Sequence, residues 1–284
     1  ILLAILAFVI YPALPEGTID PWGALEPRTI WITIILIAGI GFINYILLKT
    51  FEGRGIELAG FLGGLVNSSV ATRELAQRIV ESRGQLAIPA YRGILLAITA
   101  MVIRNAALLA ILNPKALYSS GTAFILMLVT SLGMVFIHKK PVTDPANEQI
   151  ASFIKLASPF SLKSVLFFGA VLAVIQVAGV IGQQTFGQFG IYVTSFIGSL
   201  FSSSSAVAGA ATLSSQGTIP SETAGVCAVI ASITSAGIDL PLIIGLGDRL
   251  LIARLAKAIL IVGIMGGLGL AIFYVIFPRL VFLH

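Results

Sequence analysis

Several stretches of this sequence are apolar over about 18 residues or more, which is long enough for a helix to cross the hydrocarbon core of a bilayer. They include residues 29–48, 117–137 and 250–277. The whole chain is 57% hydrophobic and 10% charged, so it has too little polar surface to cover a water-soluble globule. We therefore expect an all-α integral membrane protein, in which the lysines and arginines of short loops indicate topology rather than nucleic-acid binding.

Nine apolar segments can be counted, and two of them contain a polar interruption. Residues 56–76 turn polar after Val66, and residues 191–213 are interrupted by Ser202–Ser205. The two segments match each other: residues 61–71 (FLGGLVNSSVA) align without a gap with residues 196–206 (FIGSLFSSSSA), 135 positions later. The match predicts an internal duplication, with chance similarity of two small-residue helices as the alternative.

This duplication divides the chain into four parts. Residues 1–27 are expected to be the end of a preceding segment and an outer loop. Residues 28–138 form repeat one, residues 139–162 a cytoplasmic linker, and residues 163–284 repeat two.

Loop charges test whether the two interrupted segments cross the membrane, because lysine and arginine are enriched in cytoplasmic loops. If all nine segments crossed, the loop and tail cations would divide ten to six. If both interrupted segments enter and return on one side, thirteen cations lie inside and only Arg28, Lys115 and Arg279 lie outside. The sequence thus predicts about seven transmembrane helices plus two re-entrant or broken helices. Three crossings then separate the starts of the repeats, so the repeat is inverted, as in many transporters.

Each helix break places unpaired backbone groups at membrane depth, where they must be buried in protein or face a wet cavity. We expect Ser69 and either Ser204 or Ser205 to begin the second half-helix of each segment. A helix start would favour an anion and a carbonyl end a cation, so the sequence leaves the sign of a ligand open. Close packing of small residues is the alternative role of the serines. The candidate substrate-binding residues are Asn67, Ser68, Ser69, Thr72, Ser202, Ser203, Ser204 and Ser205.

The charged residues narrow the choice of ligand. All 12 Asp and Glu lie in loops or near segment ends, which favours an alkali ion, an anion, a hydrated ion or a small polar solute over a bare divalent ion or a proton relay. Arg104, Asn105 and Asp239 are secondary site candidates. We expect Arg104 to extend toward the outer membrane surface and Asp239 to lie at the cytoplasmic end of its helix, with Arg249 or Arg254 as an alternative partner.

Enzymatic chemistry has little support in the sequence. His138 and His284 are the only histidines, so no Ser-His-Asp set or histidine metal site can be assembled. The single cysteine, Cys227, is expected to be a buried small hydrophobe. We therefore predict no catalytic residue, no bound metal and no cofactor. Four glycines in helix 250–277 predict a packing face, within the protein or between subunits of a homo-oligomer.

Two stretches resemble a known family of membrane domains: residues 21–31 (PWGALEPRTIW) and residues 60–72 (GFLGGLVNSSVAT). The family is the uncharacterised membrane domain found C-terminal to MgtC/SapB-type domains in many bacterial and archaeal proteins, and the resemblance covers most of residues 22–277. It implies a multi-pass protein of a prokaryotic plasma membrane. Through MgtC-type proteins it also implies an association with magnesium limitation and with regulation of other membrane proteins. The family's typical Ser-Ser-Thr at the break is Asn67-Ser68-Ser69 here.

Two functions from different classes follow. The first is a transporter or channel for a small ion or polar solute, with Asn67, Ser68, Ser203 and Ser204 lining a polar cavity near the bilayer midplane, between inverted repeats. The second is a non-transporting membrane regulator of the MgtC type, linked to magnesium homeostasis, which binds partner membrane proteins and has a dry, fully packed break. The expected partners are the lipid bilayer and, for the first function, the ion or solute.

Overall fold

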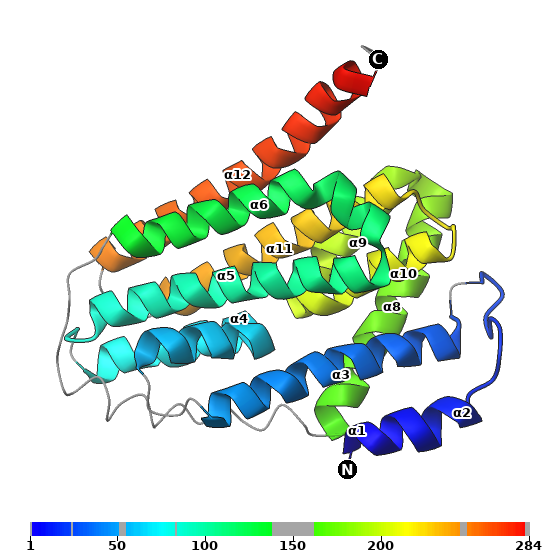
Figure 1. Cartoon of the computed structure of the whole chain (residues 1–284), viewed down its shortest axis with the longest axis horizontal. Coiled ribbons are helices and arrows are strands. Elements are labelled where there is room, and N and C mark those ends of the chain that lie inside the picture. Colours follow the sequence, from blue (N-terminus) through cyan, green and yellow to red (C-terminus); the bar gives the residue numbers. More distant parts are fainter. Residues whose placement is uncertain are drawn as a thin grey trace. The chain divides into compact units, whose positions relative to one another are not determined.

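The structure, a computed structural model, describes residues 2–23, 25–50, 55–82, 84–137, 162–244 and 249–281. These residues form helices joined by short turns, without a strand, which confirms the predicted all-α class (Figure 1). Apart from Leu162, the predicted linker 139–162 lies outside the described residues. The elements are α1 (Leu2–Ile5), the π-helix η1 (Leu6–Ile10), α2 (Tyr11–Ala13), α3 (Pro27–Thr50), α4 (Ile56–Glu81), α5 (Ala87–Leu112), α6 (Pro114–Ile137), α8 (Leu162–Phe186), α9 (Gln188–Phe201), α10 (Ser203–Ser215), α11 (Ser221–Ile244) and α12 (Arg249–Val281).

Six of the described helices are long and apolar enough to cross a membrane: α3, α5, α6, α8, α11 and α12. Their apolar stretches run over 21 to 26 residues, and about 20 are needed to cross the hydrocarbon core. Large apolar side chains such as Ile125, Val174 and Leu260 are exposed on them, as expected of helices that contact lipid. These helices support a multi-pass membrane protein. Near the start of the described residues, Leu3–Ala13 is a shorter apolar helix.

The described helices group into two compact units, and each contains one of the interrupted segments. Unit 1 consists of Ile1–Phe42, Asn105–Gly121 and Pro159–Thr234, and therefore holds α8, α9 and α10. Unit 2 consists of Ile43–Arg104, Thr122–Ser158 and Ser235–His284, and therefore holds α4 and α12. Helices α3, α5, α6 and α11 contribute residues to both units.

In unit 2, α4 folds back on itself at Asn67. Ile56 and Leu75 both lie against Gly93 of α5: a Cβ on Gly93 would be 3.2 Å from the Ile56 carbonyl oxygen and 3.0 Å from Leu75 Cδ1. A straight helix rises about 1.5 Å per residue and would hold those two positions about 28 Å apart. Asn67 has non-helical dihedrals, φ −157° and ψ 109°. The two halves of α4 therefore form a helical hairpin.

The first half of α4 packs closely on α5 through glycines. A Cβ on Gly60 would collide with the backbone of Gly93, and a Cβ on Gly64 would collide with the backbone of Ala97. Small residues at such contacts let two backbones approach without a side chain between them. This contact fixes the first half of the hairpin against α5.

In unit 1, α9 and α10 form a second helical hairpin beside α8. Ile191 near the start of α9 and Leu213 near the end of α10 both lie against Gly179: a Cβ on Gly179 would be 3.5 Å and 2.8 Å from their Cδ1 atoms. The open end of this hairpin therefore lies at one level of α8.

Closer to the turn of the α9–α10 hairpin, both halves contact a residue one helical turn earlier on α8. Gly198 of α9 and Gly209 of α10 both lie against the side chain of Ile175, which would be 2.7 Å and 2.9 Å from a Cβ on each glycine. Between them, the chain turns at Ser202, whose φ of −162° and ψ of 109° are extended. Both interrupted segments are thus hairpins within their own units.

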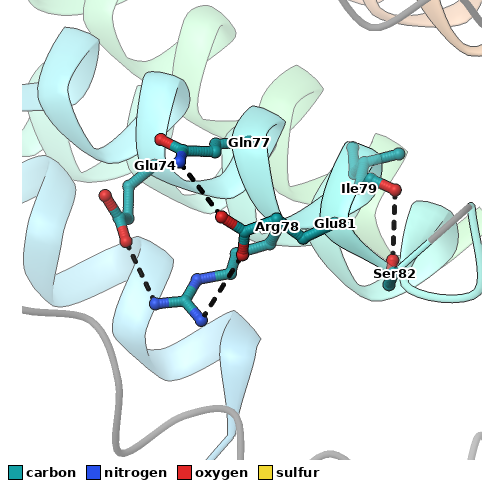
Figure 2. Close-up of polar contacts among 6 residues, drawn as sticks. All are labelled: Glu74, Gln77, Arg78, Ile79, Glu81 and Ser82. Carbon is teal, nitrogen blue, oxygen red and sulfur yellow. Dashed lines mark hydrogen bonds and ion pairs between the residues drawn. The ribbon is translucent and has the colours of Figure 1, made fainter.

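The C-terminal end of α4 is charged (Figure 2). Arg78 Nη2 lies 3.1 Å from Glu74 Oε1, and Arg78 Nη1 lies 3.9 Å from Glu81 Oε2. Gln77 Nε2 donates to Glu81 Oε1 over 3.0 Å. Partly exposed pairs of this kind contribute only about 0.5 kcal/mol each, because water already solvates the charges. This end of the hairpin therefore carries a cluster of partly exposed, paired charges.

Candidate functional site

The two hairpins turn at residues that align in the sequence match. Asn67 and Ser202 are 135 positions apart and have nearly the same ψ and φ. Asn67 Oδ1 accepts hydrogen bonds from the backbone N–H groups of Ser69 (3.1 Å) and Val70 (3.2 Å). Ser202 Oγ accepts one from the N–H of Ser205 (3.2 Å). Each side chain is therefore the N-cap of the second half-helix of its hairpin.

The predicted helix starts at Ser69 and at Ser204 or Ser205 are wrong by two or three residues. A capping oxygen bonds the N–H groups two or three positions after its own residue. Ser69 and Ser205 donate those N–H groups, so they lie inside the first helical turn. The serine run thus marks the region of the turn, and its first polar residue is the cap.

Arg104 lies at the carbonyl end of the first half of α4. Its Nη1 donates to the carbonyl oxygens of Leu65 (3.2 Å) and Val66 (2.7 Å). Asn44 of α3 donates from Nδ2 to the Leu62 carbonyl (2.6 Å). A half-helix end carries partial negative charge and unpaired carbonyls, so a guanidinium is a favourable partner there. The expectation that Arg104 extends to the membrane surface is wrong, because these carbonyls hold it inside, where it is 8% exposed.

Asp239 of α11 lies against the second half of α4. Its Oδ1 accepts a hydrogen bond from Ser69 Oγ (2.6 Å), and its Oδ2 accepts one from Thr72 Oγ1 (3.3 Å). Asp239 and Thr72 have no exposed surface. Asp239 lies near the C-terminal end of α11, as expected, but it is buried inside unit 2, where its partners are hydroxyls 167 and 170 residues earlier in the chain.

The Asn67 break thus brings charges of both signs together in unit 2. Arg104 lies at the carbonyl end of one half-helix and Asp239 lies beside the first turns of the other, so each faces the half-helix end of opposite partial charge. Buried charges in a membrane protein are unfavourable unless they are hydrogen-bonded, and they commonly mark ion or substrate sites. The carboxylate and hydroxyl oxygens offer ligands for a cation, and the two charges together offer partners for a polar solute. Asn67 is exposed, so the break reaches the surface of the unit.

The Ser202 break in unit 1 is more closely packed and carries hydroxyls. Ser203 and Ser204 are each 5% exposed, and Ser205 is fully buried with its Oγ donating to Ser202 Oγ (2.9 Å). Every residue of α10 from Ser203 to Leu213 is buried. Most of them are small, and small residues are typical of close helix packing in membranes. The geometry here agrees with the packing role of the serines.

Most of the chain matches a known protein family. The family model described as a domain of unknown function (DUF4010) matches residues 35–247. The chain belongs to this family. Both hairpin turns, Arg104 and Asp239 lie inside the DUF4010 region. No curated protein and no solved structure matches the chain. DUF4010 carries no assigned activity, and the link to MgtC/SapB-type proteins stays a prediction.

The remaining predicted residues of the DUF4010 region are buried. Ser68 is 3% exposed. Asn105, next to Arg104 in the chain, belongs to unit 1, where its Nδ2 donates to Ser232 Oγ (3.0 Å). Cys227 has no exposed surface, which confirms its prediction as a buried small residue.

Gln176 of α8 is a candidate that the sequence interpretation missed. It has no exposed surface, and among the residues that the structure describes neither its Nε2 nor its Oε1 has a hydrogen-bond partner. It follows Ile175, which contacts both halves of the α9–α10 hairpin. Thr212 Oγ1 in α10 is also buried without a partner among the described residues. In the sequence, the signal for this residue was a single amide within the apolar run 162–181. In the structure, a buried amide without a partner requires an explanation.

Proposed function

We propose that this DUF4010 protein is a membrane transporter or channel for a small ion or polar solute, with its principal site at the Asn67 break of α4. The observation that carries the proposal is the burial of Arg104 and Asp239 at one helix break. Discontinuous helices with charged or polar groups at their half-helix ends are the usual binding sites of secondary transporters. Neither charge is needed to bury an apolar helix, so their retention inside unit 2 favours a functional role.

The lengths of the half-helices agree with a site near the membrane centre. Residues 56–66 make up the first half of α4, which at about 1.5 Å per residue spans about 16 Å, roughly half of a 30 Å hydrocarbon core. Helix α9 has 14 residues and α10 has 13, which also falls short of a crossing. Together with the charged end at Glu74, Arg78 and Glu81, these lengths support a re-entrant hairpin whose tip lies inside the bilayer.

The predicted inverted repeat is the second part of the proposal. It rests on the loop charges and on the three apolar helices α5, α6 and α8, which separate the first hairpin from the second in the chain. An odd number of crossings opens the two hairpins on opposite sides of the membrane. The Ser202 break, with Ser202, Ser203, Ser204 and Ser205, is then the counterpart of Asn67, Ser68, Ser69 and Val70 in the second repeat.

Flux measurements test transport directly. The purified protein in proteoliposomes is assayed with Na⁺, K⁺, Mg²⁺, Cl⁻ and phosphate as separate solutes. We expect flux of at least one of them, reduced at least about tenfold by Arg104→Ala or Asp239→Asn, a change in activation free energy of about 1.4 kcal/mol. Thr99→Val is the matched control: Thr99 is a buried threonine of unit 2 that donates to Leu95 O and to Ser131 Oγ, away from the break. Absence of flux for every solute contradicts transport.

Cysteine labelling tests the re-entrant topology. The only native cysteine, Cys227, is fully buried and gives a low background. Single cysteines at Glu57 and Glu81, the two ends of α4, are expected to react from the cytoplasmic face. Cysteines at Gln188 and Ser215, the ends of the second hairpin, are expected to react from the outside. Labelling of Glu57→Cys and Glu81→Cys from opposite faces means that α4 crosses the membrane.

The close packing of the Ser202 break favours a second candidate, a non-transporting regulator that acts through partner membrane proteins. In such a regulator, the helix breaks only serve helix packing, and an exposed helix face binds the partner protein. The glycines of α12 were predicted to form a packing face within the protein or between subunits. Gly269 packs against Thr122 and Ala123 inside unit 2, in agreement with the first alternative, while nothing lies within 4 Å of a Cβ on Gly267. Copurification of a stoichiometric membrane partner from a prokaryotic plasma membrane, without flux, favours this candidate.

A further inference from the structure

The carboxylate of Asp239 accepts hydrogen bonds from two uncharged hydroxyl groups. Ser69 Oγ and Thr72 Oγ1 each donate to a different oxygen of the carboxylate, over 2.6 Å and 3.3 Å. Asp239 has no exposed surface, so bulk water does not solvate it. Hydroxyl groups stabilise a carboxylate but leave its negative charge in place. A buried charge of this kind favours a bound counter-ion.

We infer that Asp239, Ser69 and Thr72 form a binding site for a small dehydrated alkali cation. The inference rests on the proposed function, since it names the ligand of the same break. A hydroxyl that donates its single hydrogen to a carboxylate keeps two lone pairs on its oxygen. Both carboxylate oxygens and both hydroxyl oxygens are hard ligands of the type that alkali and alkaline-earth cations prefer. The three side chains therefore supply four oxygens from two helices, α4 and α11.

The charges at the break select a monovalent cation over a divalent one. One carboxylate neutralises one positive charge. Arg104, at the carbonyl end of the same break, already adds a positive charge to unit 2. With Arg104 counted, a monovalent ion at Asp239 leaves one net positive charge at the break and a divalent ion leaves two, so the divalent ion is the more unfavourable of the two in an apolar region. Divalent sites also commonly use several carboxylates.

An anion and a proton fit the same side chains less well. An anion beside Ser69 and Thr72 would meet the carboxylate of Asp239 at close range. A proton would use one free lone pair of one carboxylate oxygen and leave both hydroxyl oxygens unused. An alkali ion can bind lone pairs that the existing hydrogen bonds leave free on all four oxygens.

The role of Arg104 follows from the same geometry. Its guanidinium occupies the carbonyls of Leu65 and Val66, where discontinuous transporter helices commonly bind their cation. The carbonyl end is thus filled by a cation of the chain itself. The mobile cation is left with the carboxylate and hydroxyl oxygens of the second half-helix.

Equilibrium binding of radioactive ²²Na⁺ to the purified full chain in detergent tests the inference at constant pH. We expect saturable binding that Li⁺ or K⁺ displaces and choline does not. Asp239→Asn keeps the shape of the side chain and is expected to weaken binding at least about tenfold, or about 1.4 kcal/mol. Thr72→Val and Ser69→Ala are expected to weaken it severalfold, while the control Thr99→Val leaves it unchanged.

The variants keep the test decisive if one of them fails to fold. Each is first checked for a single monodisperse peak in size-exclusion chromatography. If Asp239→Asn aggregates, the test compares ²²Na⁺ binding by Thr72→Val with binding by Thr99→Val. The two variants are matched because each removes one buried hydroxyl of unit 2. Equal binding by these two folded variants overturns the inference, as does wild-type protein without saturable ²²Na⁺ binding.

Failure of this inference and failure of the proposed function give different results. Flux of an anion or neutral solute without alkali-cation binding overturns the cation site and leaves transport standing. Asp239-dependent ²²Na⁺ binding without flux of any solute supports the cation site and contradicts transport. In that case the protein is a cation-binding membrane protein of the regulator class.

Discussion

The Asn67 break of unit 2 and the Ser202 break of unit 1 share one backbone geometry but differ in their charges. Both turn at an extended residue with ψ of 109°, and both start their second half-helix with a side-chain cap. Charged side chains, Arg104 and Asp239, bond the Asn67 break. At the other break, Ser202 bonds the N–H and the hydroxyl of Ser205.

The comparison shows which part of the molecule determines the chemistry. The hairpin geometry occurs twice, and each hairpin has a polar cap, Asn67 or Ser202. The charges come from the helices packed against the Asn67 hairpin, α5 and α11. Two hairpins of one backbone geometry thus carry one charged break and one small-residue break. This difference favours a division of roles, with ion or solute binding at Asn67 and close packing at Ser202.

Removal of Arg104 is expected to have the largest effect on stability. Arg104→Ala leaves the carbonyls of Leu65 and Val66 without their charged donor, and charged hydrogen bonds contribute about 1.5–3 kcal/mol each, so we expect a loss of about 3 kcal/mol. Arg104→Lys keeps the charge but lacks the guanidinium fork, and should recover part of it. Reversible unfolding in detergent micelles measures both. At the other break, Ser205→Ala removes the bond from its Oγ to Ser202 Oγ and should cost about 1 kcal/mol or less. Equal losses at positions 104 and 205 remove the distinction between the breaks.

A methyl group at Gly64 is expected to have the next largest effect. A Cβ there collides with the backbone of Ala97, so Gly64→Ala should destabilise the protein by about 2 kcal/mol through overpacking. The aligned residue in the other hairpin is Ser199, which has a Cβ and is 3% exposed, so unit 1 accepts a side chain at this position. Gly267→Ala is the control, because nothing lies within 4 Å of its Cβ position. It should be neutral or stabilising by up to about 1 kcal/mol from helix propensity. Thermal unfolding of the two alanine variants measures the difference.

Replacement of Gln176 probes the polarity of the second hairpin. Its amide is buried without a partner among the described residues, and burying an unpaired amide costs about 1–3 kcal/mol, so Gln176→Leu should stabilise unit 1 by about 1 kcal/mol. Asn105→Leu is the contrast: it removes the bond from Nδ2 to Ser232 Oγ and should not stabilise. The same unfolding assay compares the two. Destabilisation by Gln176→Leu means that the amide binds water or a solute, and the second break would then share the polar role of the first.

The sequence predicted the positions of both hairpins but not the partners of their charged residues. The breaks were found because polar residues interrupt apolar segments at aligned positions, a local signal that needs no tertiary information. The fold class and the six long apolar helices follow from the same kind of signal. Arg104 bonds carbonyls 38 and 39 residues earlier, and Asp239 bonds hydroxyls 167 and 170 residues earlier. Such pairings arise from helix packing, which apolar periodicity does not specify. A position near a segment end therefore suggested that Arg104 extends toward the surface, whereas both Arg104 and Asp239 are buried.

Exchange of the caps is expected to have the smallest effect and tests whether the two turns are equivalent. Asn67→Ala and Ser202→Ala each remove a capping oxygen and should each cost about 1 kcal/mol. Asn67→Ser and Ser202→Asn keep a capping oxygen and should each change stability by a few tenths of a kcal/mol, because asparagine and serine cap about equally well. Denaturant midpoints at constant slope measure all four. If Asn67→Ser preserves stability but lowers flux while Ser202→Asn changes neither, the exposed amide of Asn67 has a role beyond capping. Equal and small effects on flux at both positions mean that each side chain serves only as a helix cap. Arg104 and Asp239 are then the residues that distinguish the two breaks.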